Sequence, residues 1–428
     1  MASFDQALEL ILRAVQPLET EMVDTLESVD RIIARVVIAP YGLPVFDNSA
    51  MDGYAARAQD CRQGASLDVI GFIPAGAATW PKLEAGSAIR VMTGAPVPQN
   101  ADVIVPLEEA EQDPNGKLRI SGDVRQGQYI RYSGGDVERG SELIRPGRLL
   151  GVAEVNLLAG FGITSVCVHR KPVVAILATG DELVPLGSEL SSGKIYDSNS
   201  LALAAAVKKA GATPMMLGIG RDNLESLQQK IAEGLKADAL ITAAGVSVGD
   251  RDLVREAIAG LGGKEIFWGV KMKPGKATAF SMLSGKPVFC VPGNPVSAMI
   301  TFEELVRPAL LRMSGRHAVA RPLVTAVLQD TLRKKSGRIF FARVELKLVD
   351  GKLLAWSAGR QDTGFQRTML RADGIALLPL ESAGCNAGDE IKVQILSSEF
   401  NLLEMEEALS AIRLACGCGA QPEPAGRH

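Results

Sequence analysis

The feature that most constrains the fold of this 428-residue chain is an alternation of short apolar runs and helical patterns that begins at Pro172. The runs predict strands at 173–178, 213–219, 239–242, 266–272, 277–283 and 287–291, and the patterns between and after them predict helices at 201–210, 224–235, 253–258 and 296–313. Apolar strands that alternate with helices are typical of a mostly parallel sheet covered by helices on both faces. We therefore predict an α/β domain in this part of the chain.

The segments before and after this region lack the regular alternation of strands and helices. Residues 3–16 have helical spacing with a serine N-cap, residues 25–34 predict a second short helix, and residues 35–38 predict a strand. Short β-type runs between turns predict an all-β module, with strands near 69–72, 88–92, 103–106, 118–121 and 129–131. A second β module is expected at 322–396, with strands near 323–328, 339–348, 353–355, 374–378 and 391–395.

These patterns divide the chain into four predicted domains and a tail. The first β module is inserted into a domain that is split in sequence, because we expect the segments before and after it to pack together. The predicted boundaries are 1–17 and 170–320 for the α/β domain, 18–46 and 133–169 for the split domain, 47–132 for the inserted module, 321–400 for the last module and 401–428 for the tail.

Composition argues against several classes of protein. A net charge of −3 argues against a nucleic-acid partner, so any anion site must be local. Three histidines argue against a histidine-based zinc site, and six cysteines without a CxxC pair fit a reducing cytoplasm. No signal peptide is expected because Asp5 and Glu9 stand near the start. No membrane span is expected because Glu154 and Asn156 interrupt the most apolar window.

Several predicted strands end in turns rich in Gly, Pro, Ser, Lys and carboxylates, at 179–182, 220–222, 244–252, 273–276 and 292–295. Because ligands of open α/β sheets bind outside the carboxyl ends of the strands, we expect these turns to surround one crevice. Its lysines and backbone amides suit phosphate or another oxyanion, whereas its carboxylates suit Mg²⁺ that bridges to phosphate. Candidate ligand-binding residues in these turns are Thr179, Gly180, Gly245, Ser247, Gly293 and Asn294.

Each turn taken alone has a structural alternative. The 179–182 turn could be a plain turn with an N-cap aspartate, and the lysines could form a solvated edge, although lysines that flank Pro-Gly favour anion binding. Ser247 is favoured as a turn residue over a nucleophile, because the three histidines offer no Ser-His-Asp arrangement. No Walker A or GxGxxG pattern occurs, which disfavours P-loop and nicotinamide sites.

Together with polar loops at 46–54, 90–98 and 131–136, these turns carry a resemblance to a known family. The words FDNSAMDGYA, MTGAPVP, TGDEL, IYDSN, GVSVG, KPGK and PGNPVSA, in this order, resemble the molybdopterin molybdenumtransferase family (MoeA and the E domain of gephyrin) from about residue 3 to 396. The resemblance implies an α/β molybdopterin-binding domain, a split elongated α+β domain, an inserted β domain and a C-terminal β barrel, in an extended homodimer. It also implies transfer of molybdenum from molybdate to adenylated molybdopterin, with Mg²⁺ and release of AMP.

The resemblance also assigns roles to residues. Asp52, Asp136, Asp252, Lys273 and Lys276 would be catalytic, with the lysines holding anionic groups, and Glu182 and Asp222 would be the candidate Mg²⁺ ligands. Pro292 and Pro295 would shape the pocket, and Arg343 and Thr363 would lie near the same cleft. The site would be completed across the homodimer, so Asp52 is expected to face the α/β domain of the other subunit. A molybdopterin adenylyltransferase is a candidate partner.

Three positions depart from the family pattern. Ala244 stands where glycine is usual, Gly269 stands where a lysine is common, and Asp362 adds a charge beside Thr363. Lys271, two residues after Gly269, could face the same side as that lysine. These departures motivate an alternative hypothesis, a non-catalytic molybdopterin-binding or scaffold paralogue. A third hypothesis, the adenylyltransferase step, is disfavoured by the added β modules. The choice between molybdate and tungstate, and the role of the Cys416–Cys418 tail, stay open.

Overall fold

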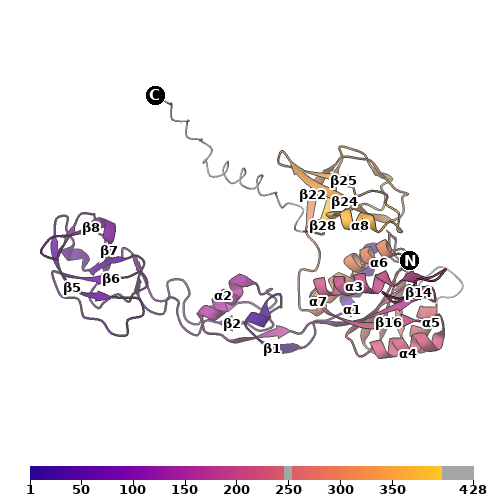
Figure 1. Cartoon of the computed structure of the whole chain (residues 1–428), viewed down its shortest axis with the longest axis horizontal. Helices are drawn as coiled ribbons and strands as arrows, with labels where there is room; N and C mark the ends of the chain where they lie inside the picture. Colours follow the sequence, from indigo (N-terminus) through magenta and orange to yellow (C-terminus); the bar gives the residue numbers. More distant parts are fainter. Residues whose placement is uncertain (245–252, 398–428) are drawn as a thin grey trace, which may run out of the picture. The chain divides into compact units, whose positions relative to one another are not determined.

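The computed structural model describes residues 1–244 and 253–397. The chain divides into two units, one made of Met1–Glu21 and the residues from His169 onward, and the other of Met22–Val168 (Figure 1). The four-domain division proposed from the sequence is finer than this, and its boundaries remain a proposal. Within the described ranges, no helix is long and apolar enough to cross a membrane.

A six-stranded sheet forms the centre of the α/β part, in the order β16-β13-β17-β21-β20-β18. Strands β13 (Val173–Thr179), β16 (Thr213–Gly220), β17 (Ala239–Ala243) and β21 (Lys286–Val291) are parallel, whereas β20 (Ala279–Leu283) is antiparallel to its neighbours β21 and β18 (Lys264–Trp268). Because β20 is antiparallel to β21 and β18 is antiparallel to β20, β18 runs in the same direction as the parallel strands. Its carboxyl end therefore lies at the same edge as the carboxyl ends of the parallel strands.

Helices cover both faces of this sheet because alternate residues of each strand point to opposite sides (Figure 1). In β13, Val174 and Ile176 pack into one apolar cluster, and Ala175 and Leu177 pack into another. The first cluster includes residues of α1 (Phe4–Ala14), α3 (Ser198–Lys209), α6 (Pro295–Thr301), a π-helical turn (Phe302–Val306) and α7 (Arg307–Met313). The second includes residues of α4 (Leu224–Gly234) and α5 (Leu253–Gly260).

The last module is a closed barrel, because β24 pairs with both β25 and β26 in the order β19-β24-β25-β22-β28-β26. Its strands are β22 (Leu323–Leu328), β24 (Ile339–Val349), β25 (Lys352–Ser357), β26 (Gly374–Leu378) and β28 (Glu390–Ile395). Strand β19 (Met272–Lys273) comes from the α/β part and pairs in parallel with the start of β24. Smaller elements are β14 (Leu183–Val184), β15 (Ile195–Tyr196), β23 (Leu332–Arg333), β27 (Gly384–Cys385) and α8 (Arg367–Arg371).

The second unit contains the inserted β module, whose sheet has the order β7-β4-β6-β5-β9-β8. Its strands are β4 (Gly53–Ala56), β5 (Ser66–Ile73), β6 (Ser87–Val91), β7 (Val103–Pro106), β8 (Ala110–Gln112) and β9 (Lys117–Ile120). Strand β4 was not among the predicted strands, although it is buried within the sheet. Gly53 gives it room, since a Cβ there would collide with the carbonyl oxygen of Val105.

The rest of this unit is built from short pairings and one helix. Strand β1 (Thr20–Asp24) pairs with β12 (Ser165–His169), β2 (Val37–Ile38) with β11 (Glu142–Ile144), and β3 (Asn48–Ser49) with β10 (Ile130–Arg131); α2 spans Val152–Gly160. The predicted helix at 25–34 is wrong, because only Leu26–Ser28 forms a 3₁₀ turn. Asp30 then takes φ +63°, and Ile33 donates to the carbonyl of Arg148. Long-range pairing therefore replaces the local helix.

Candidate functional site

The carboxyl ends of β13, β17 and β21 border a cavity of about 650 Å³, which we name the strand-end cavity. It lies beside the point where the strand order reverses between β13 and β17, the position at which open α/β sheets bind ligands. Its walls are formed by residues 178, 179, 182, 183, 195–199, 243, 244, 277, 292–295 and 366. The predicted site residues Thr179, Glu182, Pro292, Gly293, Asn294 and Pro295 therefore lie on one cavity.

Neighbouring groups hold the polar atoms of this cavity in place. The buried Thr179 hydroxyl donates to the carbonyl of Ala243 at 3.4 Å. The side-chain amide of Asn199 donates to the carbonyl of Gly293 at 2.7 Å, which ties the start of α3 to the Pro-Gly-Asn-Pro turn. Asp197 caps α3 by accepting from the Ser200 amide at 3.0 Å. The cavity thus presents a fixed pattern of hydrogen-bonding groups.

The candidate Mg²⁺ ligands lie on two turns that are bonded to each other. The Asp181 amide donates to Oδ2 of Asp222 at 3.2 Å, and the Asp222 amide donates to Oδ1 of Asp181 at 3.4 Å. Glu182 lines the strand-end cavity beside this pair of turns. Among the described residues, no group of three or more His, Cys, Asp or Glu is arranged for a metal ion. Carboxylate oxygens still suit Mg²⁺, which commonly takes one or two carboxylates and completes its coordination with water and phosphate oxygens.

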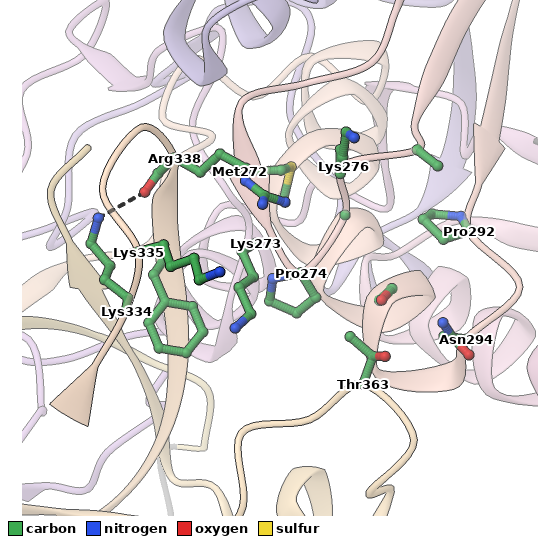
Figure 2. A pocket seen from close by; sticks show the side chains of 14 residues that line it. Met272, Lys273, Pro274, Lys276, Pro292, Asn294, Lys334, Lys335, Arg338 and Thr363 are labelled. Carbon is green, nitrogen blue, oxygen red and sulfur yellow. Dashed lines mark hydrogen bonds between the residues drawn. The ribbon is translucent and has the colours of Figure 1, made fainter. Parts of the chain in front are cut away.

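Figure 2 shows the side chains around a second cavity, which we name the basic cavity. Its volume is about 390 Å³, and it shares Ala277, Pro292 and Asn294 with the strand-end cavity. Five of its lining side chains are cationic: Lys273, Lys276, Lys334, Lys335 and Arg338. No Asp or Glu is among the described residues that line it. The remaining walls are residues 272, 274, 275, 277, 292, 294, 297, 340 and 363. A cavity of this composition attracts anions.

The loop that carries Lys273 and Lys276 is held at both ends. The Val270 amide donates to the carbonyl of Lys276 at 3.0 Å. The buried Thr278 hydroxyl donates to the carbonyl of Gly275 at 2.8 Å and lies 3.3 Å from the hydroxyl of Thr301. Gly275 is required by space as well as by its φ of +108°, since a Cβ would meet the Thr301 hydroxyl at 2.8 Å. The loop therefore presents its lysines from a fixed backbone.

The predicted cleft residues of the barrel reach the basic cavity in different ways. Thr363 lines it directly, whereas Arg343 is fully buried inside the barrel. Its guanidinium donates to the Thr368 hydroxyl at 3.1 Å and to the carbonyls of Arg360 and Asp362 at 3.2 Å. Burial lowers the pKa of Arg343 to about 10. These contacts make Arg343 the support of the loop that carries Thr363.

In the second unit, the polar loops predicted from the sequence converge at one end of the β module. Oδ1 of Asp52 accepts from the amide of Thr93 at 2.6 Å and from its hydroxyl at 2.8 Å. These hydrogen bonds lower the pKa of Asp52, the backbone bond contributing most. The third loop joins through Ser133, whose amide donates to Asp47 at 2.7 Å. Asp136 lies exposed three residues further on.

The three departures from the family pattern have local explanations. Ala244 takes φ +77°, where an alanine is strained, and its Cβ lies 2.9 Å from the position a Cβ on Gly293 would take. Gly269 takes φ +76°, a conformation that a lysine rarely adopts. Lys271 is exposed, and neither cavity as described is lined by it. The carboxylate of Asp362 pairs with Arg360 at 2.9 Å on the surface, so its charge is locally compensated.

Several lining residues were not predicted. Lys334, Lys335 and Arg338 come from the run Arg333-Lys334-Lys335-Ser336-Gly337-Arg338, whose basic residues around Ser-Gly are a signal that could have found them. Asp197, Asn199 and Ser297 stand inside the family words IYDSN and PGNPVSA. The predicted residues Gly245, Ser247 and Asp252 lie outside the described part of the chain.

Comparisons with known proteins place this arrangement in a family. Residues 2–162 match the model of the MoeA N-terminal region (domain I and II), residues 175–312 match a probable molybdopterin binding domain, and residues 325–396 match the MoeA C-terminal region (domain IV). The chain is 33% identical to a molybdopterin molybdenumtransferase of Haemophilus influenzae, over 92% of this chain and 98% of that protein. It belongs to the molybdopterin molybdenumtransferase (MoeA) family.

Other MoeA relatives agree in length and fold. A molybdopterin molybdenumtransferase of Nostoc sp. is 35% identical over 88% of each chain. The crystal structure of a molybdopterin biosynthesis MoeA protein from Pyrococcus horikosii superposes with a TM-score of 0.80 at 33% identity, over 93% of this chain and all of that one. The family and the multidomain α/β plus β fold class predicted from the sequence are therefore confirmed.

Proposed function

We propose that this protein transfers molybdenum from molybdate to adenylated molybdopterin and releases AMP. Family membership confirms the predicted role in molybdenum cofactor biosynthesis and the enzyme class. The observation that supports the detailed reaction is the pair of cavities that share Ala277, Pro292 and Asn294. A small oxyanion in the basic cavity and a large organic ligand in the strand-end cavity would be separated only by these three shared residues.

The basic cavity would hold the molybdate dianion. Lys273 and Lys276 stand on the fixed loop, and lysine ammonium groups offset the charge of an oxyanion through charge-assisted hydrogen bonds. Thr363 adds a hydroxyl from the barrel, held in position by the loop that Arg343 supports. Because these groups are placed before the ligand arrives, they cost little reorganisation during transfer.

The strand-end cavity would hold the adenylated molybdopterin. Thr179, Asn199 and the Pro-Gly-Asn-Pro turn present hydrogen-bonding groups of fixed direction, which suit an extended polar ligand. Glu182 and Asp222 would hold Mg²⁺ together with the phosphate oxygens of that ligand. When bound, Mg²⁺ would polarise the phosphoanhydride and stabilise the departing AMP. Glu182 and Asp222 would fix the ligand's phosphates at the edge of the sheet.

A second copy of the chain would complete the site with Asp52 and Asp136. Asp52 is exposed, and the hydrogen bonds from Thr93 keep it ionised, so it is available to a ligand on another subunit. The resemblance to the family implies a homodimer, and we propose one here for that reason.

Two further parts of the proposal concern the surroundings of the enzyme. Among the residues that the structure describes, Cys61, Cys167 and Cys385 form no disulfide, and this supports a cytoplasmic location. A molybdopterin adenylyltransferase would supply the substrate, because the activated ligand must be made before it is consumed. The test is whether adenylated molybdopterin passes directly from one purified protein to the other. Added free adenylate should not reduce this transfer if the two proteins are partners.

Incubation of purified protein with adenylated molybdopterin, Mg²⁺ and molybdate tests the reaction. We expect AMP release that depends on molybdate, and a product that restores activity to an apo-molybdoenzyme. Tight binding of the adenylated ligand without AMP release would contradict the proposal and favour the non-catalytic paralogue. Replacing molybdate by tungstate in the same assay measures which oxyanion the enzyme prefers.

A further inference from the structure

The chain passes between its two units twice, after residue 21 and before residue 169. We name the adjoining residues of the first unit, 18–21 and 169–171, the crossing segments. They are bonded to each other, because the amide of Arg170 donates to the carbonyl of Glu19 at 3.0 Å. Asp52 lies in the unit beyond them. The crossing segments therefore determine where the chain leaves the α/β part for the unit that carries Asp52.

The guanidinium of Arg170 joins the crossing segments to the central sheet. Its Nη1 and Nη2 donate to the two carboxylate oxygens of Asp238 at 2.6 and 2.7 Å, and its Nε donates to the carboxylate of Glu19 at 2.9 Å. Two parallel hydrogen bonds between a guanidinium and a carboxylate fix direction as well as distance. Arg170 thus holds a residue of the other crossing segment and a residue that directly precedes β17.

Asp238 continues this connection into the strands that border the strand-end cavity. Its carboxylate also accepts from the amide of Val173 at 2.8 Å, and its own amide donates to the carbonyl of Val173 at 2.8 Å. Val173 is the first residue of β13, and β13 pairs in parallel with β17. Both strands end at the strand-end cavity. The crossing segments are therefore bonded to the same two strands that supply walls of that cavity.

The contact between Arg170 and Asp238 is partly shielded from water. The side chain of Asp238 is 14% exposed and that of Arg170 is 32% exposed. Burial opposes the ionisation of Asp238, but the hydrogen bonds from Arg170 and Val173 outweigh it and lower the pKa of Asp238. The side chain of Glu19 is 77% exposed, so its ion pair with Arg170 contributes little. Asp238 is therefore the main anchor of Arg170.

The first crossing segment is also attached to the α/β part without Arg170. The amide of Leu18 donates to the carbonyl of Met313 at 2.8 Å, and the carbonyl of Leu18 lies 2.9 Å from Nδ1 of His169. Gly315 leaves room for the His169 ring, since a Cβ on Gly315 would lie 2.3 Å from Cδ2 of that ring. Because these contacts do not involve Arg170, its replacement should loosen the crossing segments without detaching them.

We propose that Arg170 is a positioning residue for the transfer reaction, because it fixes the direction in which the chain leaves the α/β part toward Asp52. This role rests on the proposed function, in which Asp52 acts across the homodimer. A change of direction at the crossing segments displaces everything beyond them, Asp52 included. Misplacing a reacting group by about 1 Å can cost about a hundredfold in rate. The bonds of Arg170 therefore bear on catalysis although Arg170 lines neither of the two cavities of the proposed site.

The test uses Arg170→Gln, which loses the charge and the paired bonds to Asp238. Its kcat for molybdate-dependent AMP release should fall about tenfold or more. KM for molybdate and Kd for adenylated molybdopterin should change less than about threefold, because the ligand-binding groups of the two cavities are untouched. Arg170→Lys keeps the charge but lacks the planar fork, so its kcat should fall by a smaller factor.

The matched control is Glu19→Gln, which removes the exposed contact of the same guanidinium and leaves its bonds to Asp238 in place. Its kcat should stay within about twofold of the parent. Hydrogen exchange measures the crossing segments directly. In Arg170→Gln, exchange should become faster in peptides that cover 18–24 and 165–171, whereas peptides that cover β13 should exchange as in the parent.

The outcomes separate this inference from the proposed function. If Arg170→Gln lowers Tm but keeps the kcat and the exchange rates of the parent, the ion pair only stabilises the fold and the inference is wrong. An equal fall of kcat in Glu19→Gln would also contradict it. If the parent itself releases no AMP, the proposed function fails, and hydrogen exchange still decides whether Arg170 holds the crossing segments.

Discussion

The two neighbouring cavities differ in the groups that they present to a ligand. The strand-end cavity presents groups whose directions are set by hydrogen bonds, such as Asn199 to Gly293, and it includes Glu182 and Asp197. The basic cavity presents five cations and no carboxylate among its described lining residues. Fixed hydrogen bonds select a ligand by shape, whereas unpaired charge attracts any small anion. Under the proposed function, the site would therefore separate recognition of the organic substrate from capture of the oxyanion.

The largest expected effect comes from removing two positive charges from the basic cavity. Lys273→Gln combined with Lys276→Gln should weaken molybdate binding by a factor on the order of a hundred or more, because two charge-assisted hydrogen bonds are lost. Binding of AMP in the strand-end cavity should change by less than about threefold. Equilibrium dialysis with each ligand measures both. Equal losses for the two ligands would mean that the cavities do not act separately.

A second prediction concerns the contact between the α/β part and the barrel. The barrel supplies cations to the basic cavity but none to the strand-end cavity. Glu304, on the π-helical turn, is buried and accepts from the side-chain amide of Gln394 in the barrel at 3.1 Å. Burial raises the pKa of Glu304 from 4.5 to about 7. The folded protein therefore holds this proton more tightly than the unfolded chain does. The resulting stability is complete below about pH 4.5 and is lost as the pH rises through about 7.

The loss should amount to at most about 3 kcal/mol in the free energy of unfolding. Tm measured from pH 5 to 8.5 should fall with rising pH in the parent, and Glu304→Gln should remove much of that fall because it keeps a neutral partner for Gln394. Molybdate binding should show the same difference if docking of the barrel supports the basic cavity. An unchanged Tm profile in the variant would exclude Glu304 as the titrating group.

On the strand-end side, Asn199→Ala removes the hydrogen bond to the Gly293 carbonyl. A single hydrogen bond of this kind contributes about 1 kcal/mol, so affinity for the adenylated ligand should fall about threefold to tenfold. Molybdate binding should stay at the parent value. Isothermal titration calorimetry with adenylated molybdopterin and dialysis with molybdate together provide the measurement. A larger loss for molybdate would reverse the assignment of the cavities.

The smallest effect is expected at Ala244. A glycine there would adopt φ +77° without strain and would remove the Cβ that faces Gly293. Relief of the left-handed strain of about 1 kcal/mol is partly offset by the greater freedom of glycine in the unfolded chain. Ala244→Gly should therefore raise Tm slightly and leave molybdate binding unchanged. A drop in stability would show that the Ala244 methyl group contributes packing that outweighs its strain.

The fold and part of the site could be predicted from the sequence because their signals are local. The apolar runs at 173–178 and 287–291 became β13 and β21, and the turns after them became the strand-end cavity. Residues whose position depends on distant pairing were harder. The helix predicted at 25–34 does not form, because Ile33 instead bonds to Arg148, which is distant in the sequence. Strand β4 was missed because it begins within a segment interpreted as a polar loop.

Candidate residues divide in the same way. Lys273 and Lys276 could be predicted because they flank Pro-Gly at a strand end, and their loop is closed by near neighbours such as Thr278. Lys335 and Arg338 could not, because only the pairing of β19 with β24 brings the barrel loop at 334–338 to that lysine loop. Arg343 was expected at the cleft from family resemblance, and its buried side chain instead supports the loop of Thr363.

The sequence by itself determined the strand and helix periodicity of the α/β part, the turns that end its strands, and the family to which the chain belongs. The tertiary structure decided which charges share a cavity, because that depends on backbone hydrogen bonds between residues far apart in the chain. It also decided which cations are enclosed by carbonyls, as Lys334 is, and which are left for a ligand. Periodicity depends on residues that are close in the sequence, whereas a charged cavity depends on residues that only folding brings together.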